Sequence, residues 1–149
     1  FNGGGQIVIS GAKQAVVRAM ALLRERGAKR VLELPVSAPF HCSLMAPAAE
    51  GLKRVLAEVE VTPFSLGVIT NVEADLNFDH NRVKPLLVAQ VVSPVRWEAS
   101  VQRMEALECE RAIEIGPGKV LSGLIKRISS RLALSNIESP ADLKKITVN

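Results

Sequence analysis

Short apolar runs alternate along this chain with longer segments in which apolar residues recur every three or four positions. The first pattern is typical of buried strands and the second of helices packed on a sheet. We expect strands at residues 6–10, 30–36, 66–71, 112–115 and 132–137, and helices at 12–26, 43–59, 83–92, 97–107, 119–128 and after Pro140. From residue 38 onward this alternation predicts the α/β class, in which helices cover the faces of a sheet. The strand, helix and strand expected in the first 37 residues resemble half of a small α+β sandwich.

Composition narrows the classes of partner. With 149 residues, 48% of them hydrophobic, the chain can bury a core as one domain or two subdomains. No apolar run approaches the roughly 20 residues of a membrane helix, so we expect no membrane span. The net charge is only +4 and aromatic residues make up 3%, which argues against a nucleic-acid partner. The mild positive charge favours acidic partners.

The two cysteines, Cys42 and Cys109, lie far apart and show no metal-ligand spacing. A zinc site or a disulfide framework is therefore not expected, and a reducing cytoplasm is the natural compartment. The chain begins at Phe1 rather than Met and runs directly into an expected strand, so we expect a fragment of a longer chain.

The first candidate for chemistry is His41, at the corner between an expected strand and the helix that begins near Ser43. The helix N-terminus disfavours a charged imidazole, and a neutral histidine can act as a general base. A lone histidine is nevertheless more often structural. Cys42 is adjacent, but neighbouring side chains in an extended segment point to opposite faces. We therefore expect Cys42 to be a packing residue.

No partner for this base is evident. The strand–Ser–helix elbow G-x-S-x-G does not occur, and Ser122 falls inside an expected helix, where its hydroxyl would bond back to the backbone. His80, beside Asp79, is expected in an exposed loop, and further metal ligands are not found near it. The sequence thus predicts a base without a nucleophile, and no metal.

A second candidate is EIGPGK, residues 114–119, where a Gly-Pro-Gly turn links a strand to a helix. Gly116 and Gly118 would let the backbone approach a ligand closely, with the helix N–H groups directed at it. A tight turn without a ligand is the alternative at this point.

Five collinear stretches together resemble one family. They are GQIVISG (5–11), KRVLELPVSAPFHCSLMAPA (29–48), TNVEA (70–74), QVVSPVRW (90–97) and EIGPGKVLSGLIKRI (114–128). They resemble malonyl-CoA:acyl-carrier-protein transacylase, the acyltransferase of bacterial-type fatty acid synthesis. The resemblance implies the C-terminal half of that enzyme. Residues 1–37 would end a ferredoxin-like small subdomain, and residues 38–149 would complete an α/β-hydrolase-like large one.

The resemblance also implies roles for individual residues. His41 would be the catalytic base, the backbone carbonyl of Gln90 would orient it, and Asn71 would lie near it. The family's nucleophilic serine, its malonyl-binding arginine and its oxyanion-hole glutamine would all lie upstream. These 149 residues alone are therefore expected not to form an acyl-enzyme.

For the substrate, the resemblance implies that Val120 lines the acyl or pantetheine pocket and that Phe40 helps to select malonyl over methyl-branched units. Asn2 falls in a segment that reads Asn-Gly-Gly-Gly-Gln where the family often has Asn-Ser-Pro-Gly-Gln, so we expect a looser loop there. The implied substrates are malonyl-CoA and the phosphopantetheine of an acidic acyl carrier protein. No bound cofactor is implied.

Two other interpretations remain open on the sequence. A non-catalytic binding or scaffolding module of the same fold would leave His41 inert. A self-contained cysteine hydrolase using Cys42 ranks last, because Cys42 and His41 would rarely meet.

Overall fold

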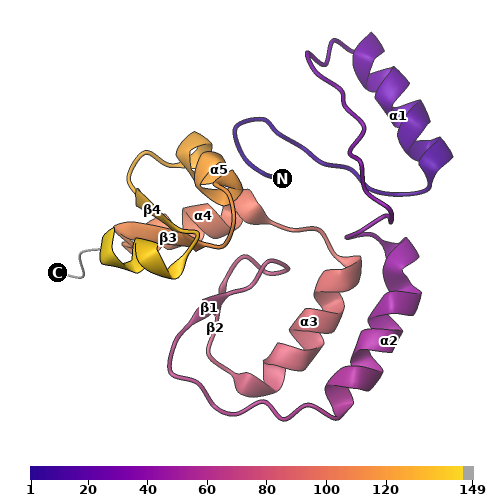
Figure 1. Cartoon of the computed structure of the whole chain (residues 1–149). Coiled ribbons are helices and arrows are strands. Elements are labelled where there is room, and N and C mark those ends of the chain that lie inside the picture. The colour runs from indigo at the N-terminus through magenta and orange to yellow at the C-terminus, as the bar shows by residue number, and fades with distance from the viewer. Residues whose placement is uncertain (146–149) are drawn as a thin grey trace. The chain divides into compact units, whose positions relative to one another are not determined.

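The computed structural model describes residues 1–145, which form two compact units, each assembled from separate stretches of the chain. The first unit contains Phe1–Ile7, Ile69–Asp75 and the chain from Arg96 onward. The second contains Val8–Val68 and Leu76–Val95. Figure 1 shows the order of the elements along the chain.

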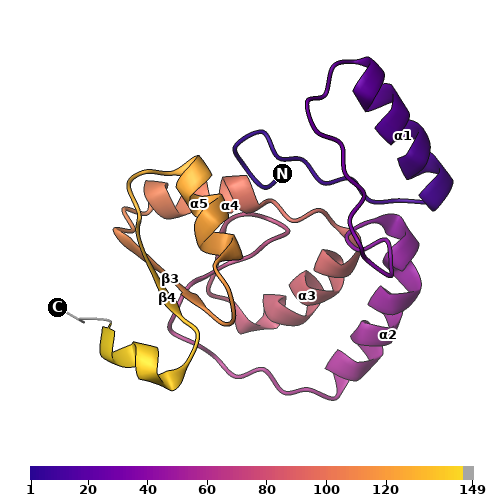
Figure 2. The same ribbon diagram turned by 45° about the horizontal axis from the view of Figure 1, so that its top comes forward.

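The second unit is mainly helical, with α1 (Lys13–Glu25), η1 (Ser43–Met45), α2 (Ala46–Ala57), η2 (His80–Arg82) and α3 (Val83–Val92). Helices α2 and α3 pack against each other and lie side by side in Figures 1 and 2. Pro47 is tolerated because it falls in the first turn of α2. Helix α1 ends where Gly27 adopts a φ of +83° and the amide of Ala28 donates to the carbonyl of Leu23. This is the C-terminal stop expected at Gly27.

The first unit is built on α4 (Trp97–Ala106), β3 (Arg111–Ile115), α5 (Val120–Ile128), β4 (Ala133–Ile137) and η3 (Pro140–Lys145). Strands β3 and β4 pair in parallel, with Arg111 opposite Ala133 and Ile115 opposite Ile137. Parallel neighbours need a crossover, which α5 supplies. The core of the unit consists of Val101, Ile125 and Leu132, against which Trp97, Met104, Ala112, Ile128 and Leu134 pack.

A short hairpin, β1 (Val68–Ile69) and β2 (Leu76–Asn77), encloses the turn TNVEA. The amide of Thr70 donates to the carbonyl of Asp75 across it, at 3.0 Å. The strand expected at 66–71 is thus reduced to two residues, and β2 was not predicted.

The α/β class is confirmed by the parallel β3–α5–β4 unit. The strands expected at residues 6–10 and 30–36 are wrong, because neither segment pairs with another strand in the described chain. A strand is stable only when its backbone groups have a partner. Apolar side chains on both segments stay exposed, with Ile7 at 60%, Leu32 at 62% and Val36 at 61%. The predicted boundary at residues 37/38 coincides with no edge of either unit and stays a prediction.

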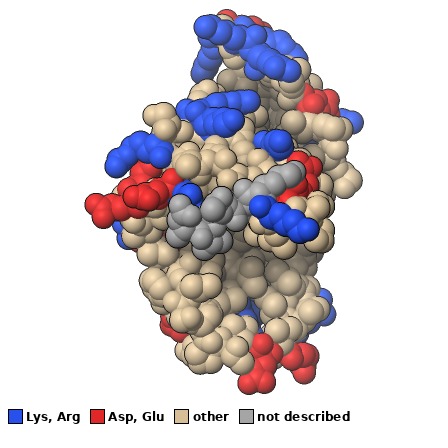
Figure 3. All heavy atoms as spheres, turned by 60° about the vertical axis from the view of Figure 1, so that its left-hand side comes forward, with Lys and Arg blue, Asp and Glu red and all other residues tan. Residues whose placement is uncertain are grey.

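On the face drawn in Figure 3, lysine and arginine are interspersed with acidic and uncharged residues. Within residues 1–145, the helices are all too short or too polar to cross a membrane.

Candidate active site

His41 lies at a sharp corner of the second unit, directly before η1. Its φ is +62°, in the left-handed region that a non-glycine residue rarely adopts. The extended geometry expected there is therefore wrong at His41. Such backbone strain persists only where the surroundings fix it, and it concentrates at functional sites.

The ring of His41 is held by the last turn of α3. Its Nδ1 lies 3.1 Å from the backbone carbonyl oxygen of Gln90 and 3.3 Å from the Gln90 side-chain Nε2. Nε2 of Gln90 donates to the carbonyl of Ser93 at 3.1 Å. The carbonyl of Gln90 is the acceptor for the ring, which assigns the proton to Nδ1. The other ring nitrogen then carries a lone pair and is free to accept a proton.

The carbonyl of Gln90 also suits the charge that the ring acquires on accepting a proton. Gln90 lies in the last turn of α3, where the helix dipole is negative, and its carbonyl also accepts the amide of Ser93 at 3.4 Å. A carbonyl at this position stabilises an imidazolium by hydrogen bonding to Nδ1–H. The arrangement can therefore serve general-base catalysis without a carboxylate.

Cys42 is not placed as a nucleophile. Its Sγ donates to the carbonyl of Pro39 at 3.1 Å, and the residue is half-buried. Phe40, on the other side of His41, is 49% exposed.

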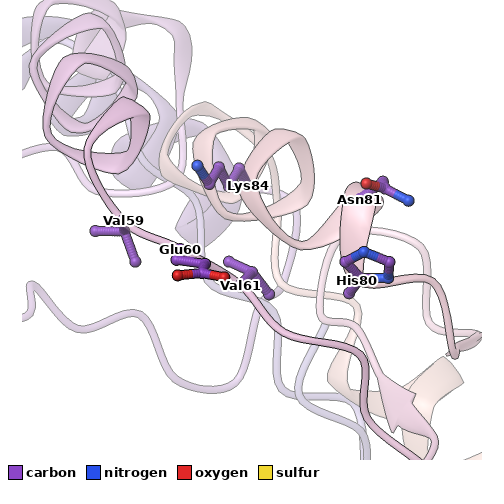
Figure 4. Close-up of a pocket in the computed structure, with 6 residues that line it drawn as sticks. All are labelled: Val59, Glu60, Val61, His80, Asn81 and Lys84. Carbon is purple, nitrogen blue, oxygen red and sulfur yellow. The ribbon is translucent and has the colours of Figure 1, made fainter.

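His80 differs from its predicted setting. It begins η2 rather than lying in a loop, and it is half-buried, with Nδ1 4.0 Å from Oδ1 of Asp79. It lines a surface hollow of about 300 Å³ together with Val59, Glu60, Val61, Asn81 and Lys84, as Figure 4 shows. Lys84 and Gln90 are six residues apart on α3, about 9 Å at about 1.5 Å per residue. The hollow is thus at the other end of α3 from His41.

The Gly-Pro-Gly corner belongs to the first unit. Gly116 and Gly118 have φ of +133° and +86°, conformations that favour glycine. A side chain at either position would meet nothing within 4 Å, and Val120 is 71% exposed. The corner that the sequence singled out is therefore an open surface.

Glu114 is a residue of this corner that the sequence reasoning missed. Its Oε1 accepts the amide of Leu121 at 3.0 Å, and its Oε2 accepts the amide of Ser122 at 2.8 Å and Nδ2 of Asn136 at 3.0 Å. These hydrogen bonds, led by those from the Ser122 side chain and backbone, lower the pKa of Glu114 from 4.5 to about 2. The sequence did carry one sign of this role: Glu114 is a charged residue between Ile113 and Ile115 in an expected strand, and the structure places it on the covered face of that strand.

The expectation for the Ser122 hydroxyl is also wrong. Its hydroxyl accepts Nδ2 of Asn136 at 3.1 Å and bonds to Glu114, instead of bonding back to its own helix. The Ser122 hydroxyl is buried in this network, so it is not a free nucleophile.

The low pKa of Glu114 predicts a pH-dependent contribution to stability. The folded pKa is about 2 and the ordinary value is 4.5, so the contribution is complete above pH 4.5 and is lost as the pH falls towards 2. We expect Glu114→Gln to lower the free energy of unfolding most above pH 4.5 and progressively less below it. Denaturant titrations at several pH values measure this, with Glu110→Gln as the control. A loss of unfolding free energy in Glu114→Gln that is the same at every pH would contradict the lowered pKa of Glu114.

Asn71 lies exposed in the turn TNVEA, which α4 fixes. The amide of Arg96 donates to the carbonyl of Asn71 at 3.0 Å, and the Arg96 side chain donates to the carbonyl of Glu73 at 3.1 Å. Arg103 pairs with Asp75 at 2.7 Å between Nε and Oδ1. The turn that carries Asn71 is thus tied to one helix at three points.

Asn2 lies at a closed loop, so the looser loop expected there is wrong. The amide of Asn2 donates to the carbonyl of Gln6 at 3.0 Å, and Gly3 and Gln6 form a β-bridge. Gly3, Gly4 and Gly5 all have positive φ. Gly3 is buried against Ile128, which leaves no room for a side chain.

The structure therefore brings His41 and Gln90 into contact and gathers Gly116, Gly118 and Val120 at one corner. Asn71 and Asn2 lie in two further turns of the first unit. Among residues 1–145, no three histidine, cysteine, aspartate or glutamate side chains are grouped as metal ligands would be.

No family model matches the chain. Among curated proteins, it is 45% identical to the malonyl CoA-acyl carrier protein transacylase of Salmonella typhimurium, over 96% of this chain and 46% of the relative. It is also 45% identical to the transacylase of Bacillus subtilis, over 97% of this chain and 45% of the relative. The chain thus spans about half the length of the curated relatives that it matches.

The chain is similar to solved structures of the same enzymes. The acyl carrier protein S-malonyltransferase of Vibrio cholerae superimposes with a TM-score of 0.93 at 47% identity, covering 99% of this chain and 48% of that chain. A malonyl-transacylase in complex with its type II PKS acyl-carrier protein gives a TM-score of 0.91 at 40% identity, covering 97% and 47%. In sequence and in backbone, the chain therefore belongs to the malonyl CoA-acyl carrier protein transacylases, with an extent that fits their C-terminal half.

Proposed function

We propose that this chain supplies the base of a malonyl-CoA:acyl-carrier-protein S-malonyltransferase. The observation that carries the proposal is the contact between Nδ1 of His41 and the Gln90 carbonyl, which leaves the other ring nitrogen free to accept a proton. The identity of 45% to curated transacylases supports the same reaction.

In the proposed reaction, Nε2 of His41 takes the proton from a serine hydroxyl as the serine oxygen attacks the thioester carbonyl of malonyl-CoA. The proton then passes to the departing sulfur of coenzyme A, and the malonyl group remains on the serine as an ester. The phosphopantetheine thiol attacks this ester in the second half-reaction and gives its proton to the same nitrogen. The serine recovers that proton when the ester bond breaks.

The substrates follow from the same assignment. We assign malonyl-CoA as donor and the phosphopantetheine thiol of an acyl carrier protein as acceptor, in fatty acid biosynthesis. The complex of a related transacylase with a carrier protein supports the acceptor. Serine-ester and thioester exchange needs only a base, so we assign no bound cofactor. The two free cysteines are compatible with a cytoplasmic location.

We assign roles at the site to three further residues and to the corner of the first unit. Asn71 would lie beside the base, Phe40 would select the acyl group, and Asn2 would contact the substrate from the closed glycine loop. Gly116, Gly118 and Val120 would line the acyl or pantetheine pocket. The open surface of their corner supports this, because nothing lies within 4 Å of the position of a Cβ at either glycine and Val120 is exposed.

The serine would come from a polypeptide that matches the other half of the relatives. The exposed apolar residues of segments 6–10 and 30–36 support such a partner, since strand pairing would cover them. The open face of β3 supports it as well, with Ile113 at 45% and Ile115 at 78% exposed, because parallel sheets are normally covered on both faces.

Association with that half is expected to change the fluorescence of Trp97, the single tryptophan of the chain. Trp97 lines a hollow of about 100 Å³, and its buried Nε1 has no hydrogen-bond partner. We expect a blue shift when a tryptophan-free first half of the Escherichia coli transacylase is added, because the part of the ring that is still exposed would lose its contact with water. The Trp97→Phe chain is the control for signal from other sources. An emission spectrum unchanged at stoichiometric excess would contradict the association.

The test of function is a chimera that joins the first half of the E. coli transacylase, which is 44% identical over the matched region, to these 149 residues. Transfer of radiolabelled malonyl from malonyl-CoA to carrier protein is the measurement. We expect the chimera to transfer malonyl and the 149 residues alone not to retain the label. A folded but inactive chimera would favour a non-catalytic module instead.

A further inference from the structure

The corner from Gly116 to Val120 keeps its shape without side-chain packing. Both glycines have open space where a Cβ would be, and Val120 and Ile115 are 71% and 78% exposed. Neighbouring side chains therefore do not hold this segment in place. Hydrogen bonds to its backbone must fix its geometry.

The acceptors of those hydrogen bonds are two carboxylates and a backbone carbonyl at the end of β4. The amide of Gly116 donates to the carbonyl of Ile137 at 2.9 Å, and the amide of Gly118 donates to Oε2 of Glu138 at 3.2 Å. Beyond the turn, the amides of Leu121 and Ser122 donate to Glu114. The corner is thus anchored before, within and after the turn.

Among these anchors, Glu114 is the side chain that connects β3, α5 and β4. Helix α5 has no side-chain cap from its own N-cap residue, Lys119, and Glu114 reaches over from β3 to supply it. Asn136 of β4 donates to Glu114 and to Ser122, which closes the network between the two strands and the helix. The carboxylate therefore sets the angle at which α5 leaves the turn.

We propose that Glu114 is a positioning residue for the acyl or pantetheine site: by clamping the start of α5, it places Gly116, Gly118 and Val120 where the substrate binds. This rests on the proposed function. This clamp, the hydrogen bonds from the amides of Leu121 and Ser122 to Glu114, affects the binding of substrate and of transition state alike, whereas His41 acts on proton transfer. Losing the clamp should therefore raise KM and leave kcat nearly unchanged.

Glu114→Gln in the chimera is the test. A glutamine keeps one acceptor oxygen but directs an NH₂ group at donors that now bond to the carboxylate. We expect KM for malonyl-CoA to rise roughly tenfold, with kcat within about twofold, and the calorimetric Kd for malonyl-CoA to rise in parallel. The matched control is Glu110→Gln, the same chemical change just before β3. Within the described residues the Glu110 side chain makes no hydrogen bond, so KM should stay constant.

A milder variant, Ser122→Ala, removes only the hydroxyl that bonds to Glu114 and accepts from Nδ2 of Asn136. It should raise KM by a smaller factor, roughly twofold to threefold, with a smaller loss of melting temperature than Glu114→Gln, so KM is compared per folded molecule. KM and Kd that stay constant per folded molecule in both variants would overturn the proposal and make Glu114 purely structural. An inactive chimera would instead refute the proposed function, while the Kd comparison would still decide the role of Glu114.

Discussion

Replacing His41 by alanine is expected to lower kcat of the chimera by about 10²–10⁴-fold, with little change in KM for malonyl-CoA. In the proposed reaction the imidazole takes the serine proton at Nε2, while its Nδ1 contacts the carbonyl of Gln90. Without it, the serine oxygen must attack while still protonated. Steady-state transfer assays with malonyl-CoA and carrier protein measure both constants.

The backbone of His41 requires a second variant. Its φ of +62° is more readily adopted by asparagine than by alanine, so His41→Asn keeps the corner while removing the base. Both variants should lose activity to a similar extent if proton transfer is what matters. Cys42→Ala should retain activity, because its thiol only donates to the carbonyl of Pro39. Transfer rates that survive both His41 changes would end the assignment of the base.

Gly3→Ala is expected to destabilise the first unit by roughly 3 kcal/mol. The left-handed φ of +81° costs a non-glycine residue about 1–2 kcal/mol, and the new Cβ would overlap Cγ1 and Cδ1 of Ile128. Overpacking of this kind costs about 1–3 kcal/mol more. Ile128 cannot turn away freely, since a β-branched side chain in a helix has one strongly preferred rotamer. Thermal unfolding of the chimera is the measurement.

Gly5→Ala separates the two contributions. Its φ of +80° is nearly the same, but a Cβ there meets nothing within 4 Å. We expect it to cost about 1–2 kcal/mol from the backbone alone. Equal destabilisation by the two substitutions would show that the contact with Ile128 contributes nothing.

The sequence predicted those elements whose stability is local. Helix α3 was expected at its observed bounds, and β3, α5 and β4 were expected within a residue or so. Their apolar residues follow one period, and Gly116 and Gly118 punctuate the boundary between β3 and α5. His41 was a candidate from its place before a helix, whereas Gln90 came from the resemblance, because no spacing rule connects residues 49 positions apart.

What the sequence did not predict depends on partners elsewhere. Residues 6–10 and 30–36 have the composition of strands, but pairing decides whether such segments form a sheet. Local patterns also carry no sign of the left-handed backbone at His41, because it is imposed by the surrounding corner. Glu114 was missed because a carboxylate in a strand is ordinarily assigned to the solvent face.

The clamp at Glu114 has a consequence for how this region acquires its structure. Glu114 bonds to amides only seven and eight positions further along the chain. Closing so short a loop loses little chain entropy, and contacts of low sequence separation form fast. The contacts of Glu114 with the first turn of α5 can therefore form early in folding, before β4 pairs with β3.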